Sequence, residues 1–217
     1  MISVCIPTLN AVDDFWKCVG SIMDSSISCN IYAIDNGGLV SNSFPPNFMT
    51  IHKPESNLGV AGSWNWFIDN VPGAKVITND DIVFDSYAIE QLWIAYARDT
   101  KEGISNIIAP ENLESTFSCF LLPQTVVDKV GKFDEWISPK YAYFEDNDYH
   151  YRMSMLGIQT TRASGSFVSH VGSSTLKHFN KLKEKEHHDK FRLARTHYVR
   201  KWGGEPGQEK FTTPFGK

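Results

Sequence analysis

The sequence lacks the features of membrane-spanning and secreted, disulfide-rich proteins. Its longest apolar runs are far shorter than the ~20 residues that a transmembrane helix needs. The N-terminus has neither the basic region nor the small-residue cleavage site of a signal peptide. The 4 cysteines form no CxxC pair and stand in apolar contexts. We therefore expect buried, reduced thiols in a cytoplasmic protein.

Two glycine-rich phosphate-binding motifs are also missing. Neither GxGxxG nor GxxxxGK[ST] occurs, which argues against a dinucleotide-binding motif and a P-loop. The net charge of −4 and the lack of a known nucleic-acid module exclude nucleic acid as the expected partner. The 217 residues contain no internal repeat and no linker, so a single α/β domain is expected.

Charge is unevenly distributed along the chain. Residues 175–217 carry 11 Lys and Arg against 5 Asp and Glu, whereas residues 1–174 carry 10 basic and 20 acidic residues. The acidic part could hold cations, and the basic part could contact a diphosphate, a membrane surface or a following domain of a longer chain. A solvated charged helix explains the basic part equally well.

Strand and helix patterns alternate over the first 110 residues and predict a mostly parallel mixed sheet with helices on both faces. The strands are expected at Ile2–Pro7, Ile31–Ile34, Met49–His52, Lys75–Thr78 and Ile107–Ala109, and the helices at Ala11–Ser25 (with Asn10 as N-cap), Gly59–Asn70 and Ser86–Arg98. The second half predicts strand Phe117–Leu122, helices Gln124–Val130, Glu145–Leu156 and Asn180–Trp202, extended chain over Thr160–His170, and a loose tail.

Polar residues follow three of the predicted strands. Ligands of parallel α/β sheets bind beyond the carboxyl ends of the strands, so these clusters predict one shared site. By strand, the residues are Thr8 and Asn10, then Asp35 and Asn36, then Asn79, Asp80 and Asp81.

The Asp80-Asp81 pair indicates a metal. Adjacent carboxylates repel each other, and a hard cation such as Mg²⁺ or Mn²⁺ removes that penalty. An Asx-turn that caps the next helix is the structural alternative. His170, at the end of an extended segment, is either structural or a further ligand.

Two more segments suggest parts of a site. Small residues open the helix that follows Asn57, and they would let an anion approach free N–H groups at the helix N-terminus. Residues 144–148 contain three carboxylates at a predicted helix start. One of them could take a proton from a hydroxyl, although interaction with the helix dipole also explains their position.

In this order the motifs resemble those of family 2-type glycosyltransferases of the GT-A fold, especially rhamnosyltransferase-like members. The matching segments are Cys5-Ile6-Pro7-Thr8-Leu9-Asn10, Ile34-Asp35-Asn36-Gly37, Asn57-Leu58-Gly59-Val60-Ala61 with Asn65, Asn79-Asp80-Asp81, Gly131-Lys132-Phe133-Asp134-Glu135, Tyr143 to Tyr149, His170 to Ser174, and Tyr198 to Gly204.

The resemblance implies a single Rossmann-like domain and a role for each matching residue. Residues 1–110 would bind the nucleotide, residues 111–204 would hold the acceptor and the catalytic base, and 205–217 would form the tail. Asp81 would ligate Mn²⁺ or Mg²⁺ with His170, Asp146 would be the base with Glu145 as the alternative, and Trp136 would lie by the acceptor. The implied nucleotide-sugar contacts are Pro7, Thr8, Asn10, Asp35, Asn36, Asn57, Gly59, Asn65, Asn79 and Asp80.

The implied activity is inverting transfer of a sugar from a nucleoside-diphosphate sugar, with a uridine donor favoured, to a hydroxyl of a glycan or glycoprotein. Asn79 replaces the aspartate that often begins the metal motif, which leaves the number of ligands open. A nucleotidyltransferase would need a triphosphate loop rich in Gly, Arg and Lys after the first strand, and residues 8–11 do not supply one. A catalytically decayed sugar- or nucleotide-binding module is the remaining alternative.

Overall fold

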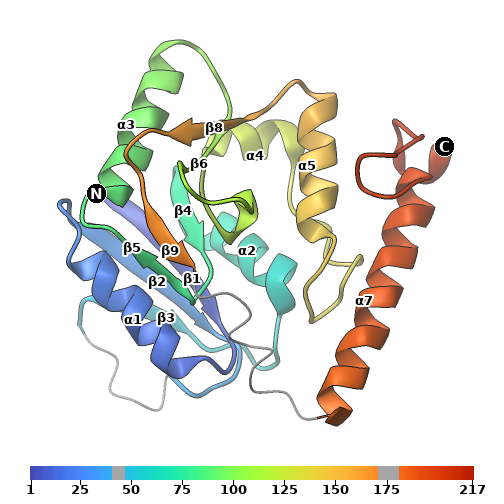
Figure 1. Cartoon of the computed structure of the whole chain (residues 1–217), viewed down its shortest axis with the longest axis horizontal. Coiled ribbons are helices and arrows are strands. Elements are labelled where there is room, and N and C mark those ends of the chain that lie inside the picture. The colour runs from blue at the N-terminus through green and yellow to red at the C-terminus, as the bar shows by residue number, and fades with distance from the viewer. Residues whose placement is uncertain (41–46, 171–180) are drawn as a thin grey trace.

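The computed structural model describes residues 1–40, 47–170 and 181–217, which fold around a seven-stranded sheet (Figure 1). The strand order is β3-β2-β1-β4-β7-β6-β8. The strands are β1 (Ile2–Thr8), β2 (Cys29–Asp35), β3 (Met49–His52), β4 (Lys75–Thr78), β6 (Ile107–Pro110), β7 (Cys119–Leu122) and β8 (Thr160–Ala163).

The sheet is mixed and mostly parallel, as predicted. β1 pairs in parallel with both β2 and β4, β2 with β3, and β6 with β8, whereas β7 runs antiparallel to β4 and β6. Since β1, β2 and β4 point the same way, their carboxyl ends meet at one edge of the sheet. The three polar clusters predicted from the sequence therefore lie at that edge.

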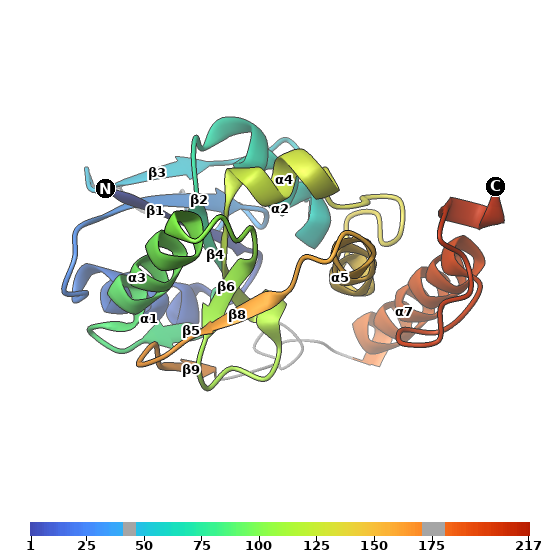
Figure 2. The ribbon, with the colours of Figure 1, turned by 90° about the horizontal axis from the view of Figure 1, so that it is seen from above.

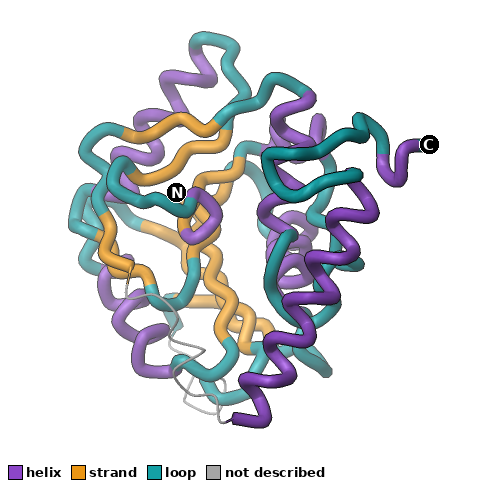
Figure 3. Tube along the Cα trace, turned by 45° about the vertical axis from the view of Figure 1, so that its right-hand side comes forward, coloured by secondary structure: helices purple, strands orange, loops and turns teal. Residues whose placement is uncertain are grey.

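Helices cover both faces of the sheet because side chains alternate along each strand. Val4 and Ile6 of β1 belong to one hydrophobic core, beneath α1 (Val12–Met23) and α3 (Ala88–Lys101). Cys5 belongs to the core on the other face, beneath α2 (Gly59–Asn70), α4 (Gln124–Val130) and α5 (Glu145–Met155). Figure 3 shows the strands in the middle of the molecule with helices around them.

A second, two-stranded sheet was not predicted. The segment expected to be extended over Thr160–His170 is split into β8 and β9 (Val168–His170) by a turn at Gly165, whose φ of 78° is in the left-handed region. β9 pairs antiparallel with β5 (Ile82–Phe84), a strand too short to be recognised from its pattern. This pairing brings residue 170 beside the chain that follows β4.

Several predicted element boundaries were wrong. α1 begins after Ala11 without any side-chain cap, so Asn10 is not its N-cap, and the helix ends at Met23. In place of a cap, the carboxylates of Asp13 and Asp14 in the first turn stabilise the helix by their interaction with the positive end of its dipole. A short 3₁₀ helix, η1 (Thr116–Ser118), replaces the predicted start of the strand that became β7.

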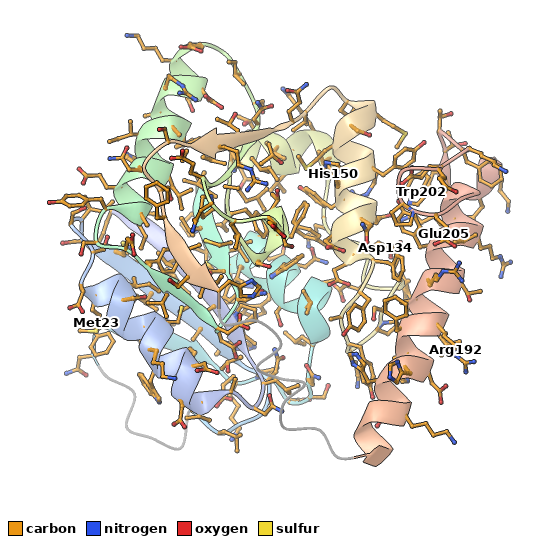
Figure 4. The ribbon with its side chains drawn as sticks, in the orientation of Figure 1. Met23, Asp134, His150, Arg192, Trp202 and Glu205 are labelled. Carbon is orange, nitrogen blue, oxygen red and sulfur yellow. The ribbon has the colours of Figure 1, made fainter. Side chains whose placement is uncertain are left out.

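The C-terminal helix α7 (Lys181–Trp202) lies on the far side of α5 from the sheet (Figure 2). Its last turn is held by Asp148, which is fully buried in α5 and accepts a hydrogen bond from Trp202 Nε1 at 2.9 Å. Lys201 Nζ lies 2.6 Å from both Asp148 Oδ1 and Asp134 Oδ2, and Arg152 Nε donates to Asp148 Oδ2 at 2.8 Å. Figure 4 shows Asp134 and Trp202 between α5 and α7.

Residues 205–217 are not the loose tail that was expected. The chain turns after α7, and the N–H groups of Lys210 and Phe211 donate to the Trp202 carbonyl at 2.9 and 3.0 Å. Tyr151 Oη of α5 donates to the Phe211 carbonyl at 2.9 Å. The chain then ends in η2 (Pro214–Gly216). No helix of the described residues is long and apolar enough to cross a membrane.

Candidate functional site

A cavity of about 420 Å³ opens at the edge where β1, β2 and β4 end. The strand ends, the start of α2, the loop before α5, β9 and α7 all contribute to its wall. The lining residues are Pro7, Thr8, Leu9, Asn36, Asn57, Gly59, Val60, Asn79, Asp80, Asp81, Lys140, Tyr141, Ala142, Tyr143, His170 and His187.

Thr8 and Asp80 connect the ends of β1 and β4. The Thr8 hydroxyl donates to Asp80 Oδ2 at 2.7 Å, and both residues are buried. Burial raises the pKa of Asp80 to about 6; the Thr8 hydrogen bond opposes this shift, and the charge of Asp81 adds to it. The hydrogen bond from Thr8 thus fixes the Asp80 carboxylate in the cavity wall.

Asp81 and His170 are brought together by the pairing of β5 and β9. Ile82 lies opposite His170 in the register, so the residue before β5 meets the end of β9. His170 Nε2 lies 3.3 Å from Asp81 Oδ1. A carboxylate and an imidazole are a donor set that suits a divalent cation, although no group of three such side chains gathers among the described residues. The rest of this matching segment, residues 171–174, lies outside the described residues.

Three N–H groups at the N-terminus of α2 are already bonded within the protein, contrary to the prediction that they are free. Asn36 Oδ1 accepts the N–H of Leu58 at 2.9 Å, and Asn57 Oδ1 accepts that of Gly59 at 2.8 Å. The Val60 N–H donates to the Tyr141 carbonyl at 2.9 Å. Protein groups thus use three of the donors expected to bind an anion.

Position 59 requires a glycine because another backbone segment crosses it. It has a φ of 72°, and a Cβ at this position would lie 2.7 Å from the Lys140 carbonyl carbon and the Tyr141 nitrogen. Asn57 Nδ2 holds the same segment by donating to the Lys140 carbonyl at 3.0 Å. The small-residue pattern therefore reflects a contact between a loop and a helix.

The loop that ends at α5 has an unusual backbone. Lys140, Tyr143 and Phe144 all have positive φ, of 64°, 100° and 67°. Such conformations are costly for residues with side chains, and the surrounding structure must hold them in place. Here the Ser138 hydroxyl donates to the Ala142 carbonyl at 2.6 Å, in addition to the contacts with α2. The result is a cavity wall that includes two tyrosines.

The first described turns of α7 complete this wall. Tyr143 Oη lies 2.7 Å from His187 Nε2, and Tyr141 Oη hydrogen-bonds to Glu186. Lys190 Nζ lies 4.8 Å from the centre of the Tyr141 ring. A solvated charged helix was one expectation for this part of the chain, but its residue His187 is half-buried and lines the cavity. Since the contact joins segments 44 residues apart, no local pattern could have identified it.

Glu145 and Asp146 begin α5 but do not line the cavity. Burial, together with the charge of Asp146, raises the pKa of Glu145 to about 8. Burial also raises the pKa of the half-buried Asp146. Asp146 Oδ1 accepts the Asn147 N–H at 2.8 Å, and Glu145 Oε2 has no hydrogen-bond partner among the described residues. No side chain caps this helix.

Four other predicted residues also lie outside the cavity lining. Asp35 is buried and accepts the N–H groups of residues 39 and 40, and Asn65 Nδ2 donates to the Phe133 carbonyl at 3.0 Å and to Glu135 Oε1 at 2.7 Å. Trp136 is 79% exposed, and Asn10 follows the cavity-lining Leu9. Asp35 and Asn65 thus hold neighbouring chain segments in place and do not line the cavity themselves.

Comparison with known proteins identifies the fold. No family model and no curated protein matches the sequence. The structure is similar to that of the mannosyltransferase PcManGT from Pyrobaculum calidifontis in complex with GDP-Man and Mn²⁺, with a TM-score of 0.62 and 12% identity over 91% of this chain and 69% of that one. S. aureus TarS 1-349 in complex with UDP-GlcNAc gives a TM-score of 0.61 and 10% identity over 90% and 65%.

These likenesses show that the chain has the GT-A fold predicted from the sequence. The chain spans about two thirds of the length of both proteins.

Proposed function

We propose that this chain is a metal-dependent glycosyltransferase that transfers a sugar from a nucleoside-diphosphate sugar to a glycan hydroxyl with inversion. One observation carries the proposal. A single cavity at the carboxyl edge of the parallel strands contains both the Thr8–Asp80 and the Asp81–His170 pairs. Two proteins with this fold bind a nucleoside-diphosphate sugar, one of them with Mn²⁺, and this supports the same class of donor here.

The nucleoside would occupy the end of the cavity formed by the strand ends and α2. Pro7 and Thr8 offer a flat surface and a hydroxyl there, and Asn36 and Asn57 belong to the same wall. The amide oxygens of both asparagines already accept backbone N–H groups, which fixes their orientation. Asp80, held by Thr8, is the group proposed to contact the ribose.

Asp81 and His170 would hold Mn²⁺ or Mg²⁺. When bound, such a cation neutralises the charge that develops on the leaving diphosphate. A site with one carboxylate and one imidazole leaves coordination positions open for phosphate oxygens. Lys140 is the lysine on the cavity wall and adds positive charge there. This charge is needed because the first N–H groups of α2 are already bonded.

Asp146 is the proposed base that takes the acceptor's proton, with Glu145 as the alternative. Burial raises the pKa of Asp146 and makes its carboxylate more basic than an exposed aspartate. Glu145 is almost fully buried, and its raised pKa keeps it largely protonated at neutral pH. Asp146 is therefore the better base at that pH. The deprotonated acceptor oxygen would attack the anomeric carbon on the side opposite the diphosphate.

Turnover of the donor tests this proposal. Asp146→Asn should lower the rate of transfer, or of donor hydrolysis in the absence of acceptor, by about 10²–10⁴-fold because a positioned base is lost. Donor affinity should stay the same. UDP-, dTDP- and GDP-sugars would be screened with Mn²⁺, and NMR would identify the anomer formed.

Full turnover by Asp146→Asn would remove this residue from the role of base, and Glu145→Gln would then be tested in the same assay. A product with the donor's anomeric configuration would contradict inversion. Nucleotide binding without any turnover of the wild type would favour a decayed binding module.

A further inference from the structure

Part of the cavity wall is formed by Tyr143, in the loop before α5, and His187, in α7. Both residues line the cavity, and their polar atoms Oη and Nε2 lie 2.7 Å apart. A phenol and an imidazole can each donate and accept hydrogen bonds, so the pair can share its bonds with a hydroxylated ligand. His187 belongs to α7, which contains none of the residues assigned to the donor so far.

The loop before α5 shows which part of a donor this pair would meet. At Lys140 and Tyr141 the loop is fixed to the N-terminus of α2, on the proposed nucleoside side. Two residues after Tyr143 it enters α5 at Glu145, beside the proposed base. Tyr143 is thus the cavity-lining residue of this loop that is nearest in the chain to the proposed base, where the reacting carbon of the donor would be placed.

The pair is also held rigidly enough to select a ligand. The ring of Phe191 lies 5.1 Å from that of Tyr143 and 5.4 Å from that of Phe144, and all three rings pack between α7 and the loop. At the other end, Trp202 ties α7 to the buried Asp148. A preorganised pair loses little conformational entropy when a ligand binds.

We propose that Tyr143 and His187 bind hydroxyl groups of the transferred sugar, so that α7 determines which donor sugar is accepted. The inference rests on the proposed function and assigns its sugar subsite. Trp136, which the sequence suggested as a sugar-contacting residue, is 79% exposed and lies outside the cavity lining. Tyr143 and His187, by contrast, both line the cavity.

Calorimetry with UDP, UDP-glucose and UDP-GlcNAc, and with GDP and GDP-mannose, tests the assignment. The quantity to compare is the ratio of the Kd of the free nucleotide to that of its sugar conjugate. His187→Ala and Tyr143→Phe should each reduce this ratio about 3–10-fold, the worth of one net hydrogen bond. The Kd of UDP itself should change less than twofold. His188→Ala is the matched control, because His188 is the exposed neighbour of His187.

The outcomes separate this inference from the proposed function. If the wild type binds sugar conjugates more tightly than free nucleotides and both variants leave the ratio unchanged, the sugar subsite is elsewhere and the proposed function stands. A wild-type ratio near one for every donor also overturns the inference. If the wild type binds no nucleotide at all, both proposals fall. Equal losses in His187→Ala and His188→Ala would also overturn the inference, because a general effect on α7 would then account for both.

Discussion

The two walls of the cavity are built in different ways. The strand wall, formed by Thr8, Asn36, Asp80 and Asp81, consists of residues that follow parallel strands, so sheet pairing fixes their positions. The helix wall, formed by Tyr141, Tyr143 and His187, comes from a loop with positive φ angles and from α7. Chemistry at strand ends can be located from sequence, whereas the helix wall exists only through tertiary contacts.

The largest effect is expected where α7 is anchored. Asp148→Ala would leave Arg152 without its carboxylate partner and Lys201 with Asp134 alone, and it would remove the acceptor of the Trp202 hydrogen bond. Breaking this buried cluster should cost about 3–5 kcal/mol of the free energy of unfolding. Chemical denaturation would measure this loss. Hydrogen exchange should show the greatest loss of protection in α7 and little change in β1 and β4.

The matched control is Asp189→Ala, which removes the ion pair between Asp189 and Arg192 on the exposed surface of the same helix. This change should cost less than about 1 kcal/mol. Equal costs for the two substitutions would mean that the buried cluster does not anchor the helix wall.

A smaller effect is expected at the point where the two walls touch. Gly59→Ala places a Cβ 2.7 Å from the backbone of Lys140 and Tyr141, in addition to the strain of a positive φ. Gly73→Ala isolates the strain, because Gly73 has a φ of 73° and open space around it, and should cost about 1–2 kcal/mol. Denaturation should show the larger loss for Gly59→Ala. If the two losses are alike, the loop is not held against α2.

The last effect concerns the dependence of stability on pH. The pKa of Glu145 is about 8 in the folded protein, above its ordinary value near 4.5, so its contribution to stability is complete below about pH 4.5. Between these values the unfolded chain ionises while the folded chain stays protonated, and the contribution is lost as pH rises through 8.

Thermal unfolding of the wild type and Glu145→Gln should therefore diverge over this range, with the variant losing less stability as pH rises. Glu102→Gln, at an exposed position, is the control and should follow the wild type. Parallel curves for all three proteins would contradict the account of Glu145.

The sequence predicted the fold and much of the strand wall because both depend on local patterns. Alternating strand and helix periodicity identified β3, α2, β4 and α4 at their observed boundaries. Thr8 at the end of β1 and the polar residues after β4 line the cavity, whereas Asn10 does not. Sequence reasoning failed where the same residue pattern can arise either from ligand binding or from contacts within the protein. The small residues at the start of α2 serve a backbone contact, and Asn65 bonds to Phe133 and Glu135 behind the cavity. His187 had no local signal at all.

The most direct test of the account is calorimetric titration of the protein with UDP, in Mn²⁺ and then in EDTA, for the wild type and Asp81→Ala. The account predicts that the wild type binds with Mn²⁺ and more weakly in EDTA, and that Asp81→Ala shows the weaker affinity under both conditions. No binding of UDP, dTDP or GDP under either condition would contradict the donor site. Equal affinity of both proteins in Mn²⁺ would contradict the metal role of Asp81.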